Sequence, residues 1–431
     1  EGSVTENNAV ADLANMLAPA DRGGADDLWR RLLSFVRRAE GRAAGLDRKT
    51  LVARLNGAFR LAGAPSLSGA LHSIEQETRL ALGEIANNIQ GLNIPRESSV
   101  NQVVQAVGVP GLLQVTGLPG VGKSVVLRLA VERLLQSGPV LLLKADRLQG
   151  STWAQYAAAS RLPNVDLEEL LVELGATGPR VLFIDGLDRI EVARRGVLKD
   201  VLHSVLNSPL LSDWLVVATV RDTGAEPLRT WLPAKLFSSV RTVEVRALDD
   251  AEATLLAEAF PSLAPLLFGG EAVRSVVRRP FFAAVLAKSV GPGQVTASSE
   301  VNLAQLWWSG GGYSAEAARA QHRRAALVGL AREGAARLGR RIPVGGIDPQ
   351  ALVELEADGI IRPQRLGHSV QFTHDIFFEW AFLQLLVGEE ERWPDVMRQV
   401  GEPPALGRVV ELLSQAELLL GENWVSYLQL L

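Results

Sequence analysis

The sequence predicts an α/β protein in which a parallel sheet is followed by a largely helical region, with further helices at both ends. Between about residues 91 and 247, short apolar runs alternate with helical patterns, an order typical of βαβ units. The first of these runs leads into a glycine-rich loop and then a helical pattern. The length of 431 residues suggests about three domains, and 47% hydrophobic residues are enough to build their cores.

Five apolar runs are the predicted strands. Their continuous apolar character is that of parallel strands, which are buried on both faces. The predicted strands are Leu112–Thr116, Val140–Lys144, Val181–Asp185, Leu215–Val220 and Thr242–Val245.

We expect five segments along the chain. From Asp249 onward the pattern is helical, except where two β-type runs flank Gly367-His368 within Ile360–Thr373. A helix pair followed by such a hairpin is the outline of a winged helix. The expected segments are a leader (loose to residue 24) and helical linker over 1–90, the αβ core over 91–247, a helical domain over 248–318, the winged helix over 319–388 and the start of a C-terminal helical extension over 389–431.

The composition excludes several classes of protein. The chain has no cysteine, which excludes disulfide scaffolds, thiolate zinc sites and cysteine nucleophiles and fits a reducing cytoplasm. The net charge of −4 gives no basic footprint of a nucleic-acid binder. The longest apolar runs are far shorter than the roughly 18 residues of a membrane span, so we expect a cytoplasmic protein without a membrane partner. The chain begins without Met and ends in an apolar helical pattern, which suggests a fragment of a longer protein.

A complete phosphate-binding motif, GxxxxGK[ST], stands between the first apolar run and the helical pattern Val125–Leu135. Glycines at these positions let backbone N–H groups form a concave anion site at a helix N-terminus. We expect Lys123 to reach the β- and γ-phosphates and Ser124 to bind Mg²⁺. The sequence therefore predicts the core of a P-loop NTPase. The predicted phosphate-binding residues are Gly117, Leu118, Pro119, Gly120, Val121, Gly122, Lys123, Ser124 and Val125.

Two acidic residues and an arginine follow later strands of the core. Asp185 ends the run Val181–Asp185, where a P-loop protein places its Mg²⁺-associated carboxylate. Asp188 would orient or activate the attacking water. Arg221 follows Leu215–Thr219 and would contact the γ-phosphate or sense its loss. The structural alternatives are a helix cap for the aspartate and a surface salt bridge for the arginine.

Together these motifs resemble the STAND class of signalling ATPases, which contains the NACHT and NB-ARC proteins. The resemblance covers about two thirds of the chain, from residue 91 to 386. The stretch Asp185–Asp188 is similar to the Walker B element of that class, and Thr219-Val220-Arg221 resembles its sensor-1 element. Three shorter matches are Ile94–Glu97, similar to the "GRE" element, Arg279-Pro280-Phe281, similar to the "GLP" element, and Phe372–Trp380, similar to the "FxHDxxxEY/W" segment.

The resemblance implies roles for three more residues and for the helical domain. Residues 248–318 would be a lid, Arg96 would lie at the base of the nucleotide, and Pro280 would line the lid. His374 would reach the β-phosphate of bound ADP and lock a closed state. The structural alternatives are solvated charge for Arg96, a helix start for Pro280 and a helix cap or core position for His374.

The resemblance also implies a regulated ATP/ADP switch. Arg189 stands where many members of the class carry Glu, which favours slow hydrolysis. Exchange of ADP for ATP with Mg²⁺ would release the winged helix and allow a homo-oligomer to form. Effector and sensor modules would lie outside this chain, and members of bacterial type often act in antiviral defence or transcriptional control.

The alternative function is that of an AAA+-like ATPase whose winged helix binds duplex DNA. The acidic pI of about 5.9 and the His374-Asp375 start of the helix after the hairpin argue mildly against a nucleic-acid partner. The Arg-rich stretch Arg319–Arg341 is predicted to be a solvated helix face. The pair Trp307-Trp308 is predicted to be core.

Overall fold

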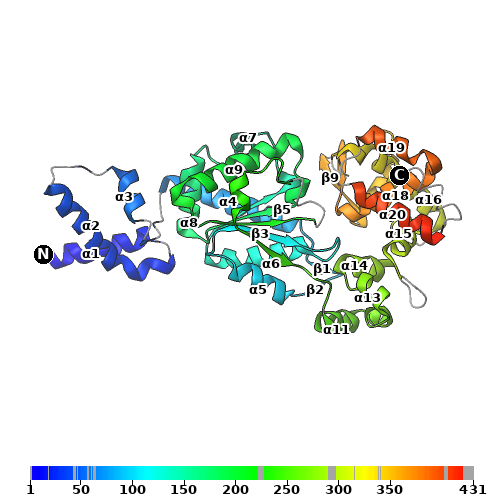
Figure 1. Cartoon of the computed structure of the whole chain (residues 1–431), viewed down its shortest axis with the longest axis horizontal. Coiled ribbons are helices and arrows are strands. Elements are labelled where there is room, and N and C mark those ends of the chain that lie inside the picture. The colour runs from blue at the N-terminus through cyan, green and yellow to red at the C-terminus, as the bar shows by residue number, and fades with distance from the viewer. Residues whose placement is uncertain are drawn as a thin grey trace. The chain divides into compact units, whose positions relative to one another are not determined.

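The computed structural model (Figure 1) forms two compact units. The first contains residues 1–87, 95–118 and 123–245, and the second contains residues 88–94, 119–122 and 246–431. Within the described part of the chain, no helix combines the length and the apolar character that a membrane span requires. The structure describes all residues except 1, 18, 42–44, 46, 56–57, 60, 62–64, 222–227, 290–297, 315, 338, 340, 366, 402–405 and 421–431.

The first unit is built on a five-stranded sheet in which every pair of neighbours is parallel. β6 lies between β3 and β5, so it separates the strand before the glycine-rich loop from the strand that ends in Asp185. The carboxyl ends of all three strands therefore share one edge of the sheet. In spatial order the strands are β4 (Leu141–Lys144), β5 (Val181–Asp185), β6 (Leu215–Thr219), β3 (Gly111–Thr116) and β7 (Val240–Glu244).

Helices cover both faces of this sheet (Figure 1). Alternate strand residues such as Leu112, Leu143 and Ile184 form one apolar cluster with four of the helices. Those helices are α4 (Pro65–Gly83), α7 (Trp153–Ala159), α8 (Leu167–Thr177) and α9 (Arg195–Asn207). The opposite face carries α5 (Glu97–Gln105) and α6 (Lys123–Leu134). Because both faces are covered, β5 and β6 are buried along their whole length, as predicted.

The N-terminal residues are helical rather than a loose leader, so that expectation is wrong. Val10, Leu13 and Ala14 lie on one side of the first helix and pack against a small cluster that contains Leu17 and Leu28. A polar composition can still give a helix when such a stripe has a partner to cover it. The elements of this segment are α1 (Gly2–Met16), the 3-10 helix Pro19–Gly24, α2 (Ala25–Glu40) and α3 (Arg48–Leu55).

The second unit contains a short hairpin, a helical domain and a winged helix with one continuous core. Trp307 is fully buried in that core, as predicted. The hairpin joins β1 (Asn88–Ile89) to β2 (Leu92–Asn93), and the helices of the domain are α11 (Asp250–Ala259), α12 (Ala264–Leu267), α13 (Glu271–Val277), α14 (Pro280–Ser289) and α15 (Glu300–Ser309).

The winged helix has the predicted hairpin at Gly367-His368, where Gly367 supplies a φ of +68°. Its strands pair antiparallel in the order β8-β10-β9. The elements are α16 (Ala317–Gly334), β8 (Ile342–Pro343), α17 (Pro349–Ala357), β9 (Ile361–Arg365), β10 (Ser369–Phe372) and α18 (Asp375–Gly388), followed by α19 (Trp393–Val400) and α20 (Gly407–Leu420). The fold is therefore that of a P-loop NTPase core with helical extensions and a winged helix, as predicted.

One part of the Arg-rich stretch differs from its prediction as a solvated face. Arg323 on α16 is only 5% exposed. Its guanidinium pairs with Asp358 and lies 3.8 Å from a carboxylate oxygen of Glu354. Arg323 can be buried because α17 and the turn after it supply two carboxylates that balance its charge.

α4 is attached to the edge strand β4 by one buried side chain. The Thr78 hydroxyl donates to the Val140 carbonyl at 2.8 Å and accepts from the Leu142 N–H at 3.3 Å. Thr78 is 1% exposed, so both backbone groups would lose a partner in a dry environment without it.

Thr78→Val should therefore lower the free energy of unfolding of the first unit by about 1–3 kcal/mol, the cost of unsatisfied buried groups. The measurement is a urea titration followed by circular dichroism. Ser73→Ala is the matched control, because the Ser73 hydroxyl also bonds within α4, to the Gly69 carbonyl, but in an exposed position. Equal losses for the two variants would contradict the assignment of Thr78 as the attachment.

Candidate functional site

The glycine-rich loop turns from β3 into α6 through three glycines with positive φ. Gly117, Gly120 and Gly122 have φ values of +134°, +79° and +94°, which residues with a Cβ rarely adopt. α6 then begins at Lys123, so its first backbone N–H groups stand at the end of the loop without intrahelical acceptors. A glycine-rich turn that leads into a helix N-terminus in this way is suited to an anion.

The Lys123 side chain lies back over the loop. Its ammonium donates to the carbonyl oxygens of Gly117 at 2.6 Å and Leu118 at 3.2 Å. Val121 is buried, which anchors the loop, whereas Leu118 is 50% exposed. A cation held against the loop in this way is placed to contact a phosphate that binds there.

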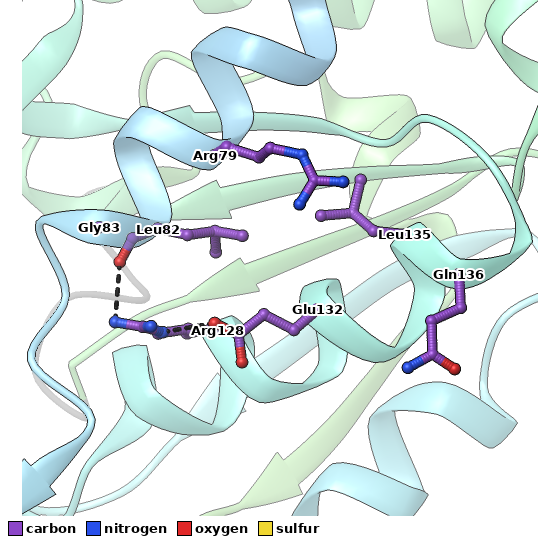
Figure 2. Close-up of a pocket in the computed structure, with 7 residues that line it drawn as sticks. All are labelled: Arg79, Leu82, Gly83, Arg128, Glu132, Leu135 and Gln136. Atoms are coloured by element: carbon purple, nitrogen blue, oxygen red, sulfur yellow. Dashed lines mark hydrogen bonds and ion pairs between the residues drawn. The ribbon is translucent and has the colours of Figure 1, made fainter.

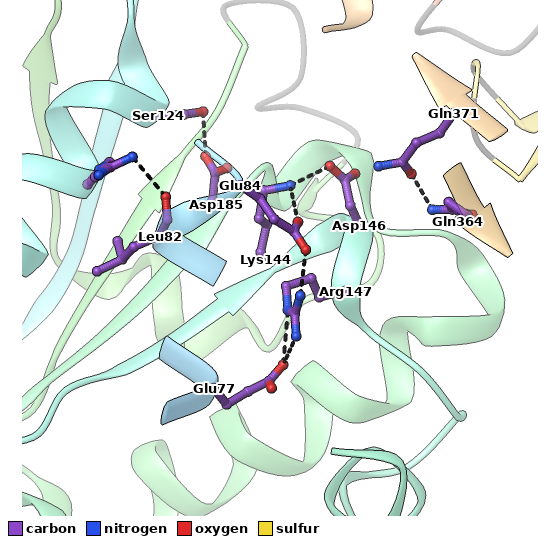
Figure 3. Close-up of polar contacts among 11 residues, drawn as sticks. Glu77, Leu82, Glu84, Ser124, Lys144, Asp146, Arg147, Asp185, Gln364 and Gln371 are labelled. Carbon is purple, nitrogen blue, oxygen red and sulfur yellow. Dashed lines mark hydrogen bonds and ion pairs between the residues drawn. The ribbon is translucent and has the colours of Figure 1, made fainter. Parts of the chain in front are cut away.

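Asp185 is the centre of a buried hydrogen-bond network at the carboxyl edge of the sheet. Its Oδ1 accepts from the Ser124 hydroxyl at 2.7 Å, drawn in Figure 3, and from the Thr219 hydroxyl at 2.8 Å. The Gly186 N–H in turn donates to the Thr219 hydroxyl oxygen at 2.7 Å. The network joins the first turn of α6 to the ends of β5 and β6.

The role of Thr219 in this network is not predicted by the sequence motifs. Thr219 is named among them only as the first residue of the stretch that resembles the sensor-1 element. A detectable signal was present, since Thr219 is a hydroxyl residue at the end of the otherwise apolar β6. Its hydroxyl both donates and accepts, and so fixes the Asp185 carboxylate relative to the backbone of Gly186.

The donor atoms at this edge suit Mg²⁺. Ser124 Oγ and Asp185 Oδ1 are hard oxygen ligands 2.7 Å apart. Among the described residues there is no group of three or more His, Cys, Asp or Glu side chains that would form a metal cage. Magnesium at nucleotide sites takes one or two protein oxygens and completes its shell with phosphates and water, so the pair fits.

Asp188 and Arg221 form a pair with each other. Asp188 Oδ2 lies 3.7 Å from Arg221 Nε, and both side chains are largely buried. A surface salt bridge is the structural alternative that the sequence leaves for Arg221. Arg221 does form a salt bridge, but the pair is largely buried and lies at the carboxyl edge of the sheet, beside β5 and β6. The Arg189 guanidinium lies over Gly186, so close that a Cβ on that glycine would be 2.7 Å from Arg189 Nε.

The tip of the loop packs against two helices of the second unit, to which residues 119–122 belong. The Gly120 carbonyl accepts from the backbone N–H of Phe281, in the first turn of α14, at 3.1 Å. A Cβ on Gly120 would be 3.2 Å from Phe281 Cβ and 3.3 Å from Ile376 Cδ1 on α18. The glycine therefore allows a close approach that another residue would prevent.

His374 caps α18, one of the two structural alternatives considered for it. Its Nδ1 accepts from the Ile376 N–H at 3.2 Å. A neutral imidazole that accepts at Nδ1 carries its proton on Nε2, which makes that nitrogen a donor. The ring lies 4.2 Å, centroid to centroid, from the ring of Phe281. His374 is therefore in contact with Phe281, the residue that contacts the loop tip.

Pro280 and Arg96 also have defined structural positions. Pro280 opens α14, where its missing N–H costs nothing. Arg96 is the N-cap residue of α5, has a φ of +53° and is 5% exposed, so solvated surface charge is the wrong interpretation. Its left-handed conformation in a buried position indicates a constrained turn.

A separate pocket lies between α4 and α6 (Figure 2). It has a volume of about 550 Å³, and Arg128 crosses it to donate to the Leu82 carbonyl at 3.1 Å and to pair with Glu132 at 2.7 Å. The predicted site residues are not among those that line it. The lining residues are Arg79, Leu82, Gly83, Arg128, Glu132, Leu135 and Gln136.

Solved structures of P-loop ATPases resemble this chain at low sequence identity. A Walker-type ATPase of Pyrococcus abyssi is 13% identical, with 68% of this chain and 97% of that chain covered and a TM-score of 0.35. A STAND protein with a tetratricopeptide repeat sensor from Pyrococcus horikoshii is 16% identical, with 80% and 53% covered and a TM-score of 0.40. DnaA from Aquifex aeolicus, bound to AMPPCP, is 14% identical, with 74% and 92% covered and a TM-score of 0.32. No protein-family model matches the chain, and no curated protein is significantly similar to it in sequence.

Gly120→Ala should destabilise the second unit more than a change at an equivalent glycine in open space. Gly346→Ala is the matched control, because Gly346 has a φ of +82° and no atom lies within 4 Å of the place that a Cβ would take. Both variants carry the left-handed backbone cost of about 1–2 kcal/mol, and Gly120→Ala adds about 1–3 kcal/mol of overpacking. Thermal unfolding measures the difference, and equal stabilities would show that the loop tip is not packed as described.

Proposed function

We propose that this chain is an adenine-nucleotide switch of the STAND type, which binds ATP or ADP with Mg²⁺ and hydrolyses ATP slowly. The observation that carries the proposal is the packing of Gly120 against Phe281 and Ile376. It makes the tip of a phosphate-binding loop part of the same core as the lid and the winged helix. The nucleotide state of the loop can then bias the arrangement of both.

The loop backbone and three side chains would hold the nucleotide phosphates and the metal. The backbone of the loop and the Lys123 ammonium would bind the β- and γ-phosphates, while Ser124 and Asp185 would hold Mg²⁺. The metal supplies neutralisation of the phosphate charge. Thr219 keeps the Asp185 carboxylate in place through its 2.8 Å hydrogen bond. Arg96 would lie on the base side, as the STAND resemblance implies.

The closed state would depend on His374. With its proton on Nε2, the ring offers a donor of the kind that a β-phosphate oxygen accepts. Residues 248–318 would act as the lid and residues 319–388 as the winged helix that opens when ATP replaces ADP. The opened chain would form a homo-oligomer and act with effector and sensor modules outside this chain, in signalling or defence.

Slow hydrolysis follows from the residues next to Asp185. Arg189 places a guanidinium over Gly186, where many STAND proteins carry a carboxylate. Asp188 Oδ2 lies 3.7 Å from Arg221 Nε, so this carboxylate is engaged by a guanidinium and would have to leave it to orient the attacking water. We therefore expect this site to bind nucleotide tightly and to hydrolyse ATP slowly.

The first test is the nucleotide content of the purified protein. We expect ADP to co-purify with the wild type and to be lost from Lys123→Ala, because no other ammonium lies over the loop among the described residues. His374→Ala and His374→Asn should both release ADP faster, by about tenfold if one charge-assisted contact of about 1.5 kcal/mol is lost. Asparagine is a good N-cap, so the second variant keeps α18 capped and isolates the phosphate contact.

The outcome that contradicts the switch is a wild type that neither carries nor binds adenine nucleotide. Faster release from His374→Ala alone would reduce the histidine to a helix cap. Duplex DNA binding that weakens steeply with salt would instead favour the AAA+-like alternative, in which the winged helix contacts phosphates.

The second test concerns the rate of hydrolysis. Arg189→Glu should raise the steady-state release of phosphate from ATP by about tenfold or more, since general-base catalysis contributes about 10²–10⁴-fold where it is intact. Asp188→Asn in the same background should remove the gain. Arg194→Glu is the control, because Arg194 stands five residues further along and pairs with Glu191 at 3.7 Å. A wild type already as fast as Arg189→Glu would show that Arg189 does not limit turnover.

A further inference from the structure

Four charged side chains from separate parts of the second unit form a buried cluster, which we call the Arg408 cluster. It consists of Arg279 before α14, Glu300 at the start of α15, Glu379 on α18 and Arg408 on α20. Arg408 is bonded to both carboxylates, one through each terminal nitrogen. Arg279 Nη1 lies 3.7 Å from the second oxygen of Glu300. The side chains are between 3% and 17% exposed.

The charges of the Arg408 cluster balance, two against two. Burial lowers the pKa of Arg279, the negative charge of Glu300 opposes that shift, and the positive charge of Arg408 adds to it. The three groups therefore act on one another electrostatically. Removal of one member of a buried ion-pair group leaves an uncompensated charge, which is far more costly than removal of a balanced pair.

The Arg408 cluster leads directly to the tip of the phosphate-binding loop. Arg279 is two residues before Phe281, whose N–H donates to the Gly120 carbonyl. Glu300 also accepts from the Trp380 indole N–H at 3.2 Å. The Trp380 ring lies 6.0 Å from the Phe281 ring. The Phe281 ring is thus in contact with Trp380, which Glu300 holds, while Arg279 stands two residues earlier in the chain and lies over the ring of Phe282.

We propose that Arg408 is a positioning residue for the phosphate-binding loop. By bridging Glu300 and Glu379 it keeps α15 and α18 together, and these hold Phe281 against Gly120. Loss of the arginine leaves the two carboxylates to repel each other, and Phe281 moves away from the loop tip. The consequence for nucleotide retention rests on the proposed function, whereas the effect on the loop itself does not.

The test compares Arg408→Met, Glu379→Gln and the double variant in the full chain. Each single change leaves one net charge in the Arg408 cluster, and the double change restores balance. Arg398→Met is the matched control, because Arg398 on α19 pairs with Asp395 but is 66% exposed. Two quantities are measured: hydrogen exchange of the amides of residues 117–125 without added nucleotide, and dissociation of a fluorescent ADP analogue.

Each single variant should speed both loop exchange and analogue dissociation by at least about fivefold, the lower range of measured couplings between sites. The double variant should return to within about twofold of the wild type, the margin of additivity for unrelated sites. Recovery in the double variant follows from charge balance, so the readout that separates a positioning role from a merely structural one is exchange of the loop amides compared with amides elsewhere in the second unit. Arg398→Met should match the wild type in both measurements.

Two results overturn the inference: loop exchange unchanged in Arg408→Met, or a double variant that is worse than either single variant. If Arg408→Met does not fold, the double variant still tests the proposal. It must then be folded and show loop exchange close to that of the wild type. If loop exchange responds as expected but no variant binds the analogue, the positioning role holds and the proposed nucleotide switch fails.

Discussion

The hydrogen bond from the Phe281 N–H to the Gly120 carbonyl ties the tip of the glycine-rich loop to the first turn of α14. It joins a loop whose shape suits phosphate to a core that runs through the lid, the winged helix and α20. Glycine suits this point because the backbone has a positive φ and a Cβ would be 3.2 Å from Phe281 Cβ. Under the proposed function, a change of bound nucleotide would reach α14 and α18 through the packing of Gly120.

At the sheet edge a different constraint applies, namely the satisfaction of a buried carboxylate. Asp185 has two hydroxyl donors, Ser124 and Thr219, which come from two different elements. If Ser124 binds Mg²⁺ as proposed, the Thr219 hydroxyl still donates to the Asp185 carboxylate. The edge can thus exchange one partner without exposing a bare charge to the protein interior.

Much of this arrangement could be predicted from the sequence, and the exceptions have physical reasons. β5 matched its apolar run because it is buried on both faces, whereas β7 begins two residues earlier than predicted because this edge strand includes the polar Arg241. The loop glycines and Lys123 follow from local chemistry. The Arg408 cluster could not be predicted, since Arg408 and Glu300 are 108 residues apart and each looks like ordinary helix charge.

The attachment of α4 to β4 also protects one edge of the sheet. Strand β4 is at the end of the sheet, where unpaired backbone groups would invite a strand from another molecule. Thr78 occupies the Val140 carbonyl and the Leu142 N–H at that border, in the place of a neighbouring strand. Helix α4 thus covers an edge strand that could otherwise pair with a strand of another molecule. A shortened chain that begins after α4 would expose β4 and would self-associate through it.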